Sequence, residues 1–454
     1  MKKLLPILLC APLLTHAQDA MSLKDAVRLA LNGNKSVEAS GAAQKVAESR
    51  IAEVRGGNLP KVDYSESWAR SDNPVFVFSS LLTQHQFGDQ NFQIGPLNRP
   101  DFLNNFQSQV TVDQHLYDAG QTKHAVRSAG LARDLSSEDG RLTRMSVISA
   151  VIRAYYDALL ASAQLNAANQ SMRSVQADLD RAESIRSAGM STDADVLSIR
   201  VHLASVHEEQ IRREADLDVA RATLNDALSL PLDTLHTLTT GLAPIKLPDE
   251  VLADYEKNAL ADRPEAREAK LAITLAENQS AAAHSNLLPQ VDLHAAFEAD
   301  RQRFYDRGGD NWLVSIRLRW NLFNGFSDRA RVEESASTLH KSQADQHRAD
   351  SAIQLQVRRA YADLRAAQQR IDVTTASVAE AEESLRITQN RYESGLNNVT
   401  DLLRTETAVL DAGTRRLAAI RDQRIAATML ELAAGTLTPD STVLDSEVLN
   451  EGSR

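Results

Sequence analysis

Cysteine, aromatic residues and positive charge are all scarce in this chain. Cys10 is the only cysteine among the 454 residues. Aromatic residues make up 5%, with three Trp, although several thick globular cores would use more large rings. Lys and Arg number 50 against 61 Asp and Glu, and this balance argues against a general nucleic-acid binder, which neutralises phosphates with basic side chains. A hydrophobic fraction of 43% excludes global disorder, so the composition indicates a folded but thinly packed protein.

The N-terminus, residues 1–17, has the pattern of a secretory signal peptide. Lys2 and Lys3 precede an apolar run from Leu4 to Leu14, and a plausible cleavage site lies before Gln18. The run is too short to cross a bilayer, which needs about 20 residues. Acylation of Cys10 would make the chain a lipoprotein, but the preceding Leu has the wrong size for that processing site. No later segment is apolar enough for a transmembrane helix. Because cleavage would remove the only cysteine, we expect an exported chain without disulfides.

Most of the remaining sequence consists of two similar copies. The segment Leu116-Tyr117-Asp118-Ala119-Gly120 matches Leu322-Phe323-Asn324-Gly325-Phe326 at an offset of 206 residues, and Asp195-Val196-Leu197 matches Asp401-Leu402-Leu403 at the same offset. An internal duplication of this kind settles the architecture before any single motif does. The first copy carries 23 extra residues, which we expect to form a loop within 74–100 because Pro, Asn and Gly collect there.

Each copy is predicted to hold a β-hairpin, a long helix and a return helix. In the first copy, 18–240, these cover about 61–117, about 120–187 and about 194–228. In the second copy, 241–437, they cover about 290–323, about 326–393 and about 400–434. Residues 438–454 are expected to be a flexible C-terminal tail.

The long helices are predicted from heptads. Neither Gly nor Pro occurs between Phe326 and Ser394, and apolar or small residues recur there at steps of four and three. This spacing is the rule of a left-handed coiled coil. One position of the seam is mostly large, as at Val357 and Leu364, and the other is mostly small, as at Ala360. A coiled-coil scaffold would show the same heptads, so they do not identify the function alone.

The hairpins alternate apolar and polar residues like strands of a membrane β-barrel. From Trp312 to Trp320 every second residue is apolar, and Trp stands at both ends. Such strands have an apolar outside, a polar inside and aromatic girdles. Glu66 interrupts this pattern in the first strand, which contains Trp68. A soluble hairpin with one polar face is the alternative for a single strand, but four strands in matching hairpins favour a membrane location, with the three Trp as girdle residues.

Four strands cannot close a barrel. The smallest bacterial barrels have eight strands, and an open edge cannot face lipid because its backbone groups would lack partners. We therefore expect the chain to oligomerise, with two copies supplying eight strands or three copies twelve.

The order of these elements resembles that of TolC-like outer-membrane efflux proteins. The resemblance rests on the duplication, on the two strand exits at Gly120 and Phe326, and on Arg391-Tyr392-Glu393-Ser394-Gly395 followed by Asp401-Leu402-Leu403. It implies a mainly α fold with a small membrane β part, in which duplicated long-helix hairpins form a periplasmic α-barrel. It also implies a homotrimer with a twelve-stranded barrel in the outer membrane of a Gram-negative bacterium, docked to a periplasmic adaptor and an inner-membrane pump.

The same resemblance implies a gate at the periplasmic ends of the helices. Tyr392 matches a gate tyrosine and Asp401 a constriction aspartate, with Asp195 as its first-copy counterpart. Asn397 stands in place of a gate arginine and Arg404 in place of a second aspartate, so this chain departs from the family pattern there. Residues expected to contact the adaptor lie at the helix tips: Gly189, Met190, Ser394, Gly395 and Leu396.

Asp401 has two interpretations. In a trimer it would form a ring of three carboxylates that attracts cations, as charged rings do in pores. Alternatively, Thr400 and Asp401 would cap the return helix and favour its dipole.

Catalytic motifs are absent from the sequence. It contains no Gly-rich phosphate loop, no His-Glu-x-x-His, no Gly-x-Ser-x-Gly and no Cys pair, so we expect no enzyme activity, metal or cofactor. The sequence therefore predicts a passive exit duct of a tripartite efflux or type I secretion system. An exported periplasmic coiled-coil scaffold or adaptor without a channel is the alternative.

Overall fold

The computed structural model describes residues 20–188, 192–246 and 250–444. The expected leader, residues 1–17 with Cys10, lies outside this range. By contacts the chain divides into two compact units. One unit comprises Met1–Ala42, Glu138–Arg267 and Arg348–Arg454, and the other comprises Ala43–Ser137 and Glu268–His347. Each unit contains segments of both sequence copies, so packing pairs the copies with each other.

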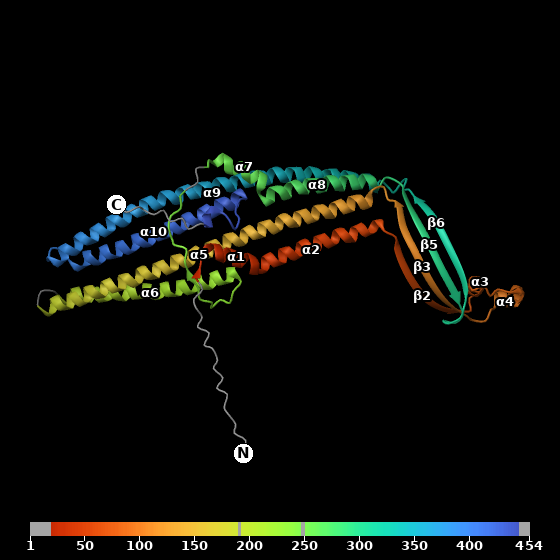
Figure 1. Cartoon of the computed structure of the whole chain (residues 1–454), viewed down its shortest axis with the longest axis horizontal. Helices are drawn as coiled ribbons and strands as arrows, with labels where there is room; N and C mark the ends of the chain where they lie inside the picture. Colours follow the sequence, from red (N-terminus) through yellow and green to blue (C-terminus); the bar gives the residue numbers. More distant parts are fainter. Residues whose placement is uncertain (1–19, 189–191, 247–249, 445–454) are drawn as a thin grey trace, which may run out of the picture. The chain divides into compact units, whose positions relative to one another are not determined.

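Two pairs of helices dominate the unit that contains the chain ends. Helix α5 (Gln121–Ser187) is followed by α6 (Asp193–Leu228), and α9 (Ser327–Glu393) is followed by α10 (Val399–Ala434) (Figure 1). Both long helices have 67 residues and both return helices have 36. The predicted heptad seam of α9 is buried from Ile353 to Ile371, where Val357 is fully buried and Ala360 and Leu364 are 8% and 4% exposed. From Thr374 to Leu385 its residues are half-buried.

Short elements complete the core of this unit. Helices α1 (Leu23–Gly33) and α7 (Leu252–Asp262) pack there, and a small parallel sheet joins β1 (Ala20–Met21) to β4 (Thr237–Leu238). Tyr155 of α5 is fully buried, and its hydroxyl donates a hydrogen bond to the Met21 carbonyl at 2.8 Å. The same hydroxyl accepts one from the Thr240 N–H at 3.1 Å. Within the described part of the chain, no helix is both long and apolar enough to cross a membrane.

The other unit contains an antiparallel sheet of four strands in the order β2-β3-β5-β6 (Figure 1). The strands are β2 (Lys61–Ser71), β3 (Leu103–Tyr117), β5 (Gln290–Arg301) and β6 (Gly309–Arg319). Helices α2 (Lys35–Arg55) and α8 (Pro264–Ser285) precede the two hairpins, and η1 (Gly56–Asn58) follows α2. The two copies therefore contribute adjacent halves of one sheet.

One face of this sheet is apolar. Residues opposite each other in register share a face, and one such row runs Tyr64, Val110, Phe297 and Trp312 across all four strands. Their exposed fractions run from 37% at Val110 to 78% at Trp312. A large exposed apolar surface of this kind marks contact with a protein or a membrane.

The carboxylate of Glu66 on this face is neutralised. Glu66 lies between the apolar residues of β2, as the sequence indicates, but it forms an ion pair with Arg301 of β5 at 2.9 Å. The Tyr64 hydroxyl also donates a hydrogen bond to Glu66 at 2.9 Å. Pairing removes most of the desolvation cost that a lone carboxylate would carry on an apolar surface.

The extra residues of the first copy are helical, and the prediction of a loop there was wrong. They form α3 (Pro74–Thr83), η2 (Asp89–Phe92) and α4 (Ile94–Asn98). Asn73 caps α3 by accepting from the Val75 N–H at 2.9 Å, and Pro74 occupies the first helical turn, where its missing N–H costs nothing. The buried Gln84 then binds Asn105 of β3 at 2.7 Å, which fixes this insertion to the sheet.

Equivalent turns join the sheet to both long helices. The Asp118 carboxylate accepts from the Thr122 N–H at 2.7 Å, and Asn324 accepts from the Asp328 N–H at 3.3 Å. After each of these side chains, two consecutive residues have positive φ: Ala119 and Gly120 in the first copy, Gly325 and Phe326 in the second. The matched strand exits are thus the same helix-capping turn.

The end of the described chain corrects one expectation. Residues 438–444 were expected to belong to a flexible tail, but η3 (Thr442–Leu444) places Val443 and Leu444 in the core at 7% and 3% exposure. Two apolar side chains in a polar stretch were enough to anchor it. Residues 445–454 lie outside the described range.

Candidate functional site at the helical tips

The tip of the second hairpin is a tight turn. Gly395 follows the last turn of α9 with φ +70°, and the Leu396 N–H donates to the Arg391 carbonyl at 2.8 Å. This is the bonding of a left-handed helix stop. Leu396 is 70% exposed, and Ser394 is also exposed.

The first tip is built differently. Thr192 caps α6 by accepting from the Asp195 N–H at 3.2 Å, and the Asp195 carboxylate accepts in return from the Thr192 N–H at 3.2 Å. This reciprocal pair is a capping box. Asp193 of the same turn pairs with Arg186 of α5 at 3.2 Å. Gly189 and Met190, predicted to contact the adaptor, lie outside the described residues.

An apolar cluster lies behind the tips. We call it the tip cluster, and its buried members come from α5, α6 and α10: Val175, Leu179, Ala182, Val196, Ile199, Val206 and Val399. Tyr392 of α9 packs against it and is partly buried. Burial raises the pKa of the Tyr392 hydroxyl, and the negative charges of Asp195 and Asp178 raise it further. The structure thus brings together two of the predicted gate residues, Tyr392 and Asp195.

The other predicted gate residues lie on the start of α10. Asn398, not Thr400 or Asp401, is the capping residue, because its side chain accepts from the Asp401 N–H at 2.9 Å. The alternative in which Asp401 itself caps the helix is therefore wrong, although its charge still lies in the first turn, where it suits the helix dipole. Asp401 and Arg404 are exposed, and Asn397 is half-buried.

Two groups of charged residues that the sequence analysis did not select also lie here. Arg181 of α5 pairs with Glu393 of α9 at 2.8 Å and so joins the two helical pairs. Behind it, Asp178 of α5 and Glu406 of α10 are 7% and 9% exposed, with His202 of α6 at 3.9 Å from Glu406. A signal existed: Glu406 follows Val399 and Leu402 at heptad spacing, where a charge is out of place.

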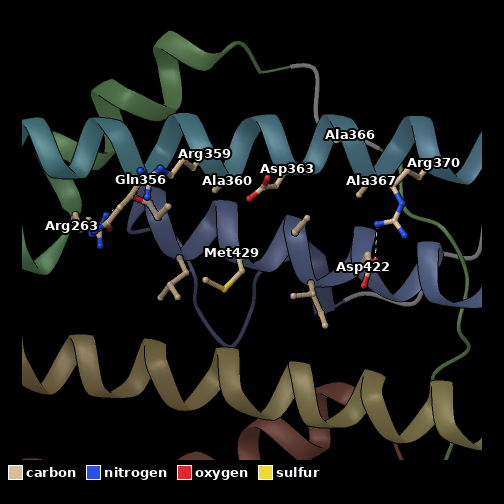
Figure 2. Close-up of a pocket in the computed structure, with 14 residues that line it drawn as sticks. Arg263, Gln356, Arg359, Ala360, Asp363, Ala366, Ala367, Arg370, Asp422 and Met429 are labelled. Atoms are coloured by element: carbon tan, nitrogen blue, oxygen red, sulfur yellow. Dashed lines mark hydrogen bonds and ion pairs between the residues drawn. The ribbon is translucent and has the colours of Figure 1, made fainter.

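A cavity of about 540 Å³ lies between α9 and α10, away from the tips (Figure 2). Ala360, Ala367 and Met429 supply apolar lining, and an ion pair of 2.9 Å joins Arg370 to Asp422. Its lining residues include no His, Ser or Cys that could serve as a nucleophile or base. Across the described residues, no three His, Cys, Asp or Glu side chains are grouped to hold a metal ion.

The three Trp that are predicted as girdle residues are all exposed. Trp68 is 60% exposed, Trp312 is 78% exposed and Trp320 is 55% exposed. Trp68 and Trp312 stand on the apolar face near the strand ends that carry the connecting loops. Trp320 follows the last residue of β6, at the other end of that strand, and donates to the Leu287 carbonyl at 3.0 Å.

Comparison with known proteins gives a consistent set of relatives. A sequence profile of the outer membrane efflux protein family matches residues 26–229 and 256–436. The chain is 27% identical to protein CyaE of Bordetella pertussis over 341 residues, which cover 74% of this chain and 72% of that protein. It is 25% identical to the proteases secretion protein PrtF of Dickeya chrysanthemi over 439 residues, covering 92% and 89%.

A solved structure shares the fold. The crystal structure of the Campylobacter jejuni CmeC outer membrane channel matches with a TM-score of 0.78 and 15% sequence identity. The match covers 93% of this chain and 87% of that one. The paired long helices and the small sheet are therefore a fold already seen in an outer membrane channel.

Proposed function

The chain belongs to the outer membrane efflux protein family and is an outer-membrane exit duct, and we propose that it assembles as a homotrimer whose sheets close a twelve-stranded barrel. The four-stranded sheet carries this proposal. One face is apolar and exposed, and β2 and β6 each have one edge without a strand partner within the described residues. In lipid these edges must be paired, which a closed ring of copies achieves, and membership of the family favours three copies over two.

The helical tips would form the gated periplasmic entrance. Tyr392 packs on the tip cluster beside Asp195, and the ion pair between Arg181 and Glu393 joins α5 to α9. These contacts hold the two helical pairs together, so breaking them would widen the entrance. In the trimer Asp401 would supply a ring of three carboxylates in the entrance.

The exposed turns suit docking of a periplasmic adaptor, which would connect the duct to an inner-membrane pump. Ser394, Gly395 and Leu396 form the described part of this surface, and Leu396 offers an exposed apolar side chain. Energy for transport would come from the pump, because the duct itself has no nucleotide-binding motif in its sequence. The protein would lie in the outer membrane and extend into the periplasm.

A polypeptide is the substrate class that we favour. The similarity to PrtF, a protein named for secretion of proteases, extends over 92% of this chain. A type I secretion system would use the same passive duct as a small-molecule efflux system. Loss of protein secretion in a deletion strain, restored by the intact gene, would support this substrate class, whereas sensitivity to small toxic compounds alone would contradict it.

Fractionation and electrophysiology test the proposed duct. We expect the protein in the outer-membrane fraction, a trimer after chemical cross-linking, and ion conductance when the purified protein is added to a planar bilayer. A scaffold or adaptor without a channel would be monomeric or periplasmic and would not conduct. Capture of the adaptor by the wild-type protein, and weaker capture by Leu396→Asp, would test the docking surface.

A further inference from the structure

Two buried carboxylates meet just behind the tip cluster. Asp178 comes from α5 and Glu406 from α10, and each is more than nine-tenths buried. The two side chains lie within hydrogen-bonding reach of each other. A buried carboxylate is costly unless it is paired, and two ionised carboxylates in contact repel each other as well.

The surrounding charges do not neutralise both groups. From α5, Arg181 lies 3.8 Å from Asp178 but makes its shorter contact with Glu393 of α9, at 2.8 Å. From α6, His202 lies 3.9 Å from Glu406, and burial lowers the pKa of its imidazole, so it is neutral at neutral pH. The Ser174 hydroxyl of α5 also faces Glu406, but it carries no charge.

The remaining ionisable groups nearby do not add positive charge. Tyr392 of α9 lies near both Asp178 and Asp195 of α6, and neither Tyr392 nor Asp195 is a cation. The Oε2 atom of Glu406 has no hydrogen-bond partner within the described residues. If Asp178 and Glu406 were both ionised, one of their two negative charges would have no positive partner. The Oε2 atom of Glu406 is available to bind a cation or a proton.

A proton fits this site better than a metal ion. The described residues contain no group of three His, Cys, Asp or Glu side chains arranged as metal ligands. A single proton between two carboxylates satisfies both, as in a carboxylate pair that shares one proton.

We propose that Asp178 and Glu406 share one proton, and that the resulting O–H···O bond is a latch that holds α10 against α5 and α6 behind the tips. Loss of the proton would then loosen the entrance, and this consequence rests on the proposed function. The latch joins α5 of the first copy to α10 of the second, so it acts on the contact between the two helical pairs.

The direction of the pH effect follows from linkage. Burial raises the pKa of Glu406 above its ordinary 4.5, and the hydrogen bond and charge of Asp178 add to the rise, which brings the pKa to about 8. When the helices part, water restores the ordinary pKa. The closed packing thus binds more protons than the open one, and its advantage is complete below pH 4.5 and is lost as the pH rises to about 8.

The experiment compares wild type with Glu406→Gln in planar bilayers between about pH 5 and pH 9. The introduced amide is neutral and can still donate a hydrogen bond to Asp178. We expect the wild-type open-to-closed ratio to rise with pH, by at most about tenfold per pH unit, and the ratio of the variant to stay low throughout. Asp178→Asn should give a smaller rise that ends at a lower pH, because burial alone still raises the pKa of Glu406. The exposed Glu382→Gln should behave as wild type.

A second measurement does not depend on a channel. The heat-unfolding midpoint in detergent should fall from about pH 5 to pH 8 for wild type, and this fall should be smaller in E406Q. If wild type conducts at no pH, the proposed function fails while the unfolding series still tests the shared proton. Equal pH slopes in wild type and E406Q, in both measurements, would overturn the latch.

Discussion

Arg181 and Arg186 lie in the same stretch of α5 but form ion pairs with residues of different helices. Arg181 reaches Glu393 on α9 at 2.8 Å, across the two helical pairs, whereas Arg186 reaches Asp193 on α6 at 3.2 Å, within one pair. Both ion pairs are about half exposed or more, so each is worth only about 0.2–1 kcal/mol. Only the ion pair of Arg181 joins the two helical pairs, so only this one would oppose opening of the entrance.

We therefore expect Arg181→Ala to increase the open fraction of the channel, by at most about fivefold. Arg186→Ala is the matched control, because it removes a similar charge without releasing α9, and it should leave the open fraction unchanged. Single-channel recording at low and high salt measures both, and the effect of Arg181→Ala should shrink at high salt because ions screen exposed pairs. Equal effects of the two variants would show that the contact does not hold the gate.

Asp401 and Arg404 permit a test with opposite signs. In the proposed trimer both exposed side chains would face the entrance, one turn apart on α10. Asp401→Ala should reduce cation preference several-fold, and Arg404→Ala should increase it, because a ring of charge in a pore selects its counter-ion. Reversal potentials under a salt gradient measure the preference. If neither variant shifts the reversal potential, the filter role of Asp401 fails.

At this scale the sequence predicted the residues that stand in recognisable motifs and missed those paired across helices. Tyr392 could be selected because it matches a gate tyrosine of the family when counted from Gly395, and Asp195 because it corresponds to Asp401 in the first copy. Arg181, Asp178 and Glu406 could not be paired with their partners, because each partner lies on a helix more than 200 residues away and no local pattern encodes that contact. Only the position of Glu406 in the heptad gave a hint.

Helix ends contain a second matched pair, Gly395 after α9 and Gly435 after α10. Both have positive φ, +70° and +77°, which costs other residues about 1–2 kcal/mol. They differ in their surroundings, since a Cβ on Gly395 would meet open space, whereas on Gly435 it would lie 2.8 Å from Cα of Arg263. The second contact is with backbone and cannot be relieved by a side-chain rotation.

Gly435→Ala should accordingly lower the heat-unfolding midpoint in detergent more than Gly395→Ala does. The backbone conformation costs the same in both variants, and the clash with Arg263 adds about 1–3 kcal/mol only in Gly435→Ala. Differential scanning of both variants beside wild type measures the difference. Identical midpoints would mean that the end of α10 relaxes away from Arg263 without loss.

The elements themselves could largely be read from the sequence, with one informative failure. Long stretches with heptad spacing and no Pro predict a helix, as in α5 and α9, and period-two alternation predicts a strand. Pro, Asn and Gly within 74–100 predict a loop, but Asn73 and Pro74 instead form the start of a helix. The compact units were also not predicted, because they pair segments of both copies and the duplication alone does not say which segments pack together.

For the whole molecule, the scarcity of Trp becomes an experimental advantage. All three Trp lie in or beside the sheet, and all are more than half exposed in the single chain. Trp68 and Trp312 lie near the loop ends of their strands, and Trp320 lies past the opposite end of β6. In an outer-membrane barrel, aromatic residues placed in this way form the two girdles at the lipid–water interfaces.

Intrinsic fluorescence in vesicles can therefore test the membrane placement of the sheet without any added label. We expect lipid-borne quenchers at headgroup depth to reduce the emission strongly, quenchers at the bilayer centre to reduce it less, and aqueous iodide to have little effect. Variants that keep one Trp and replace the other two with Phe would assign each signal, and Phe preserves the apolar surface that lipid contacts. Strong quenching by iodide with none by the lipid quenchers would place the sheet in water, and the apolar face would then have to be covered by protein, as a periplasmic scaffold requires.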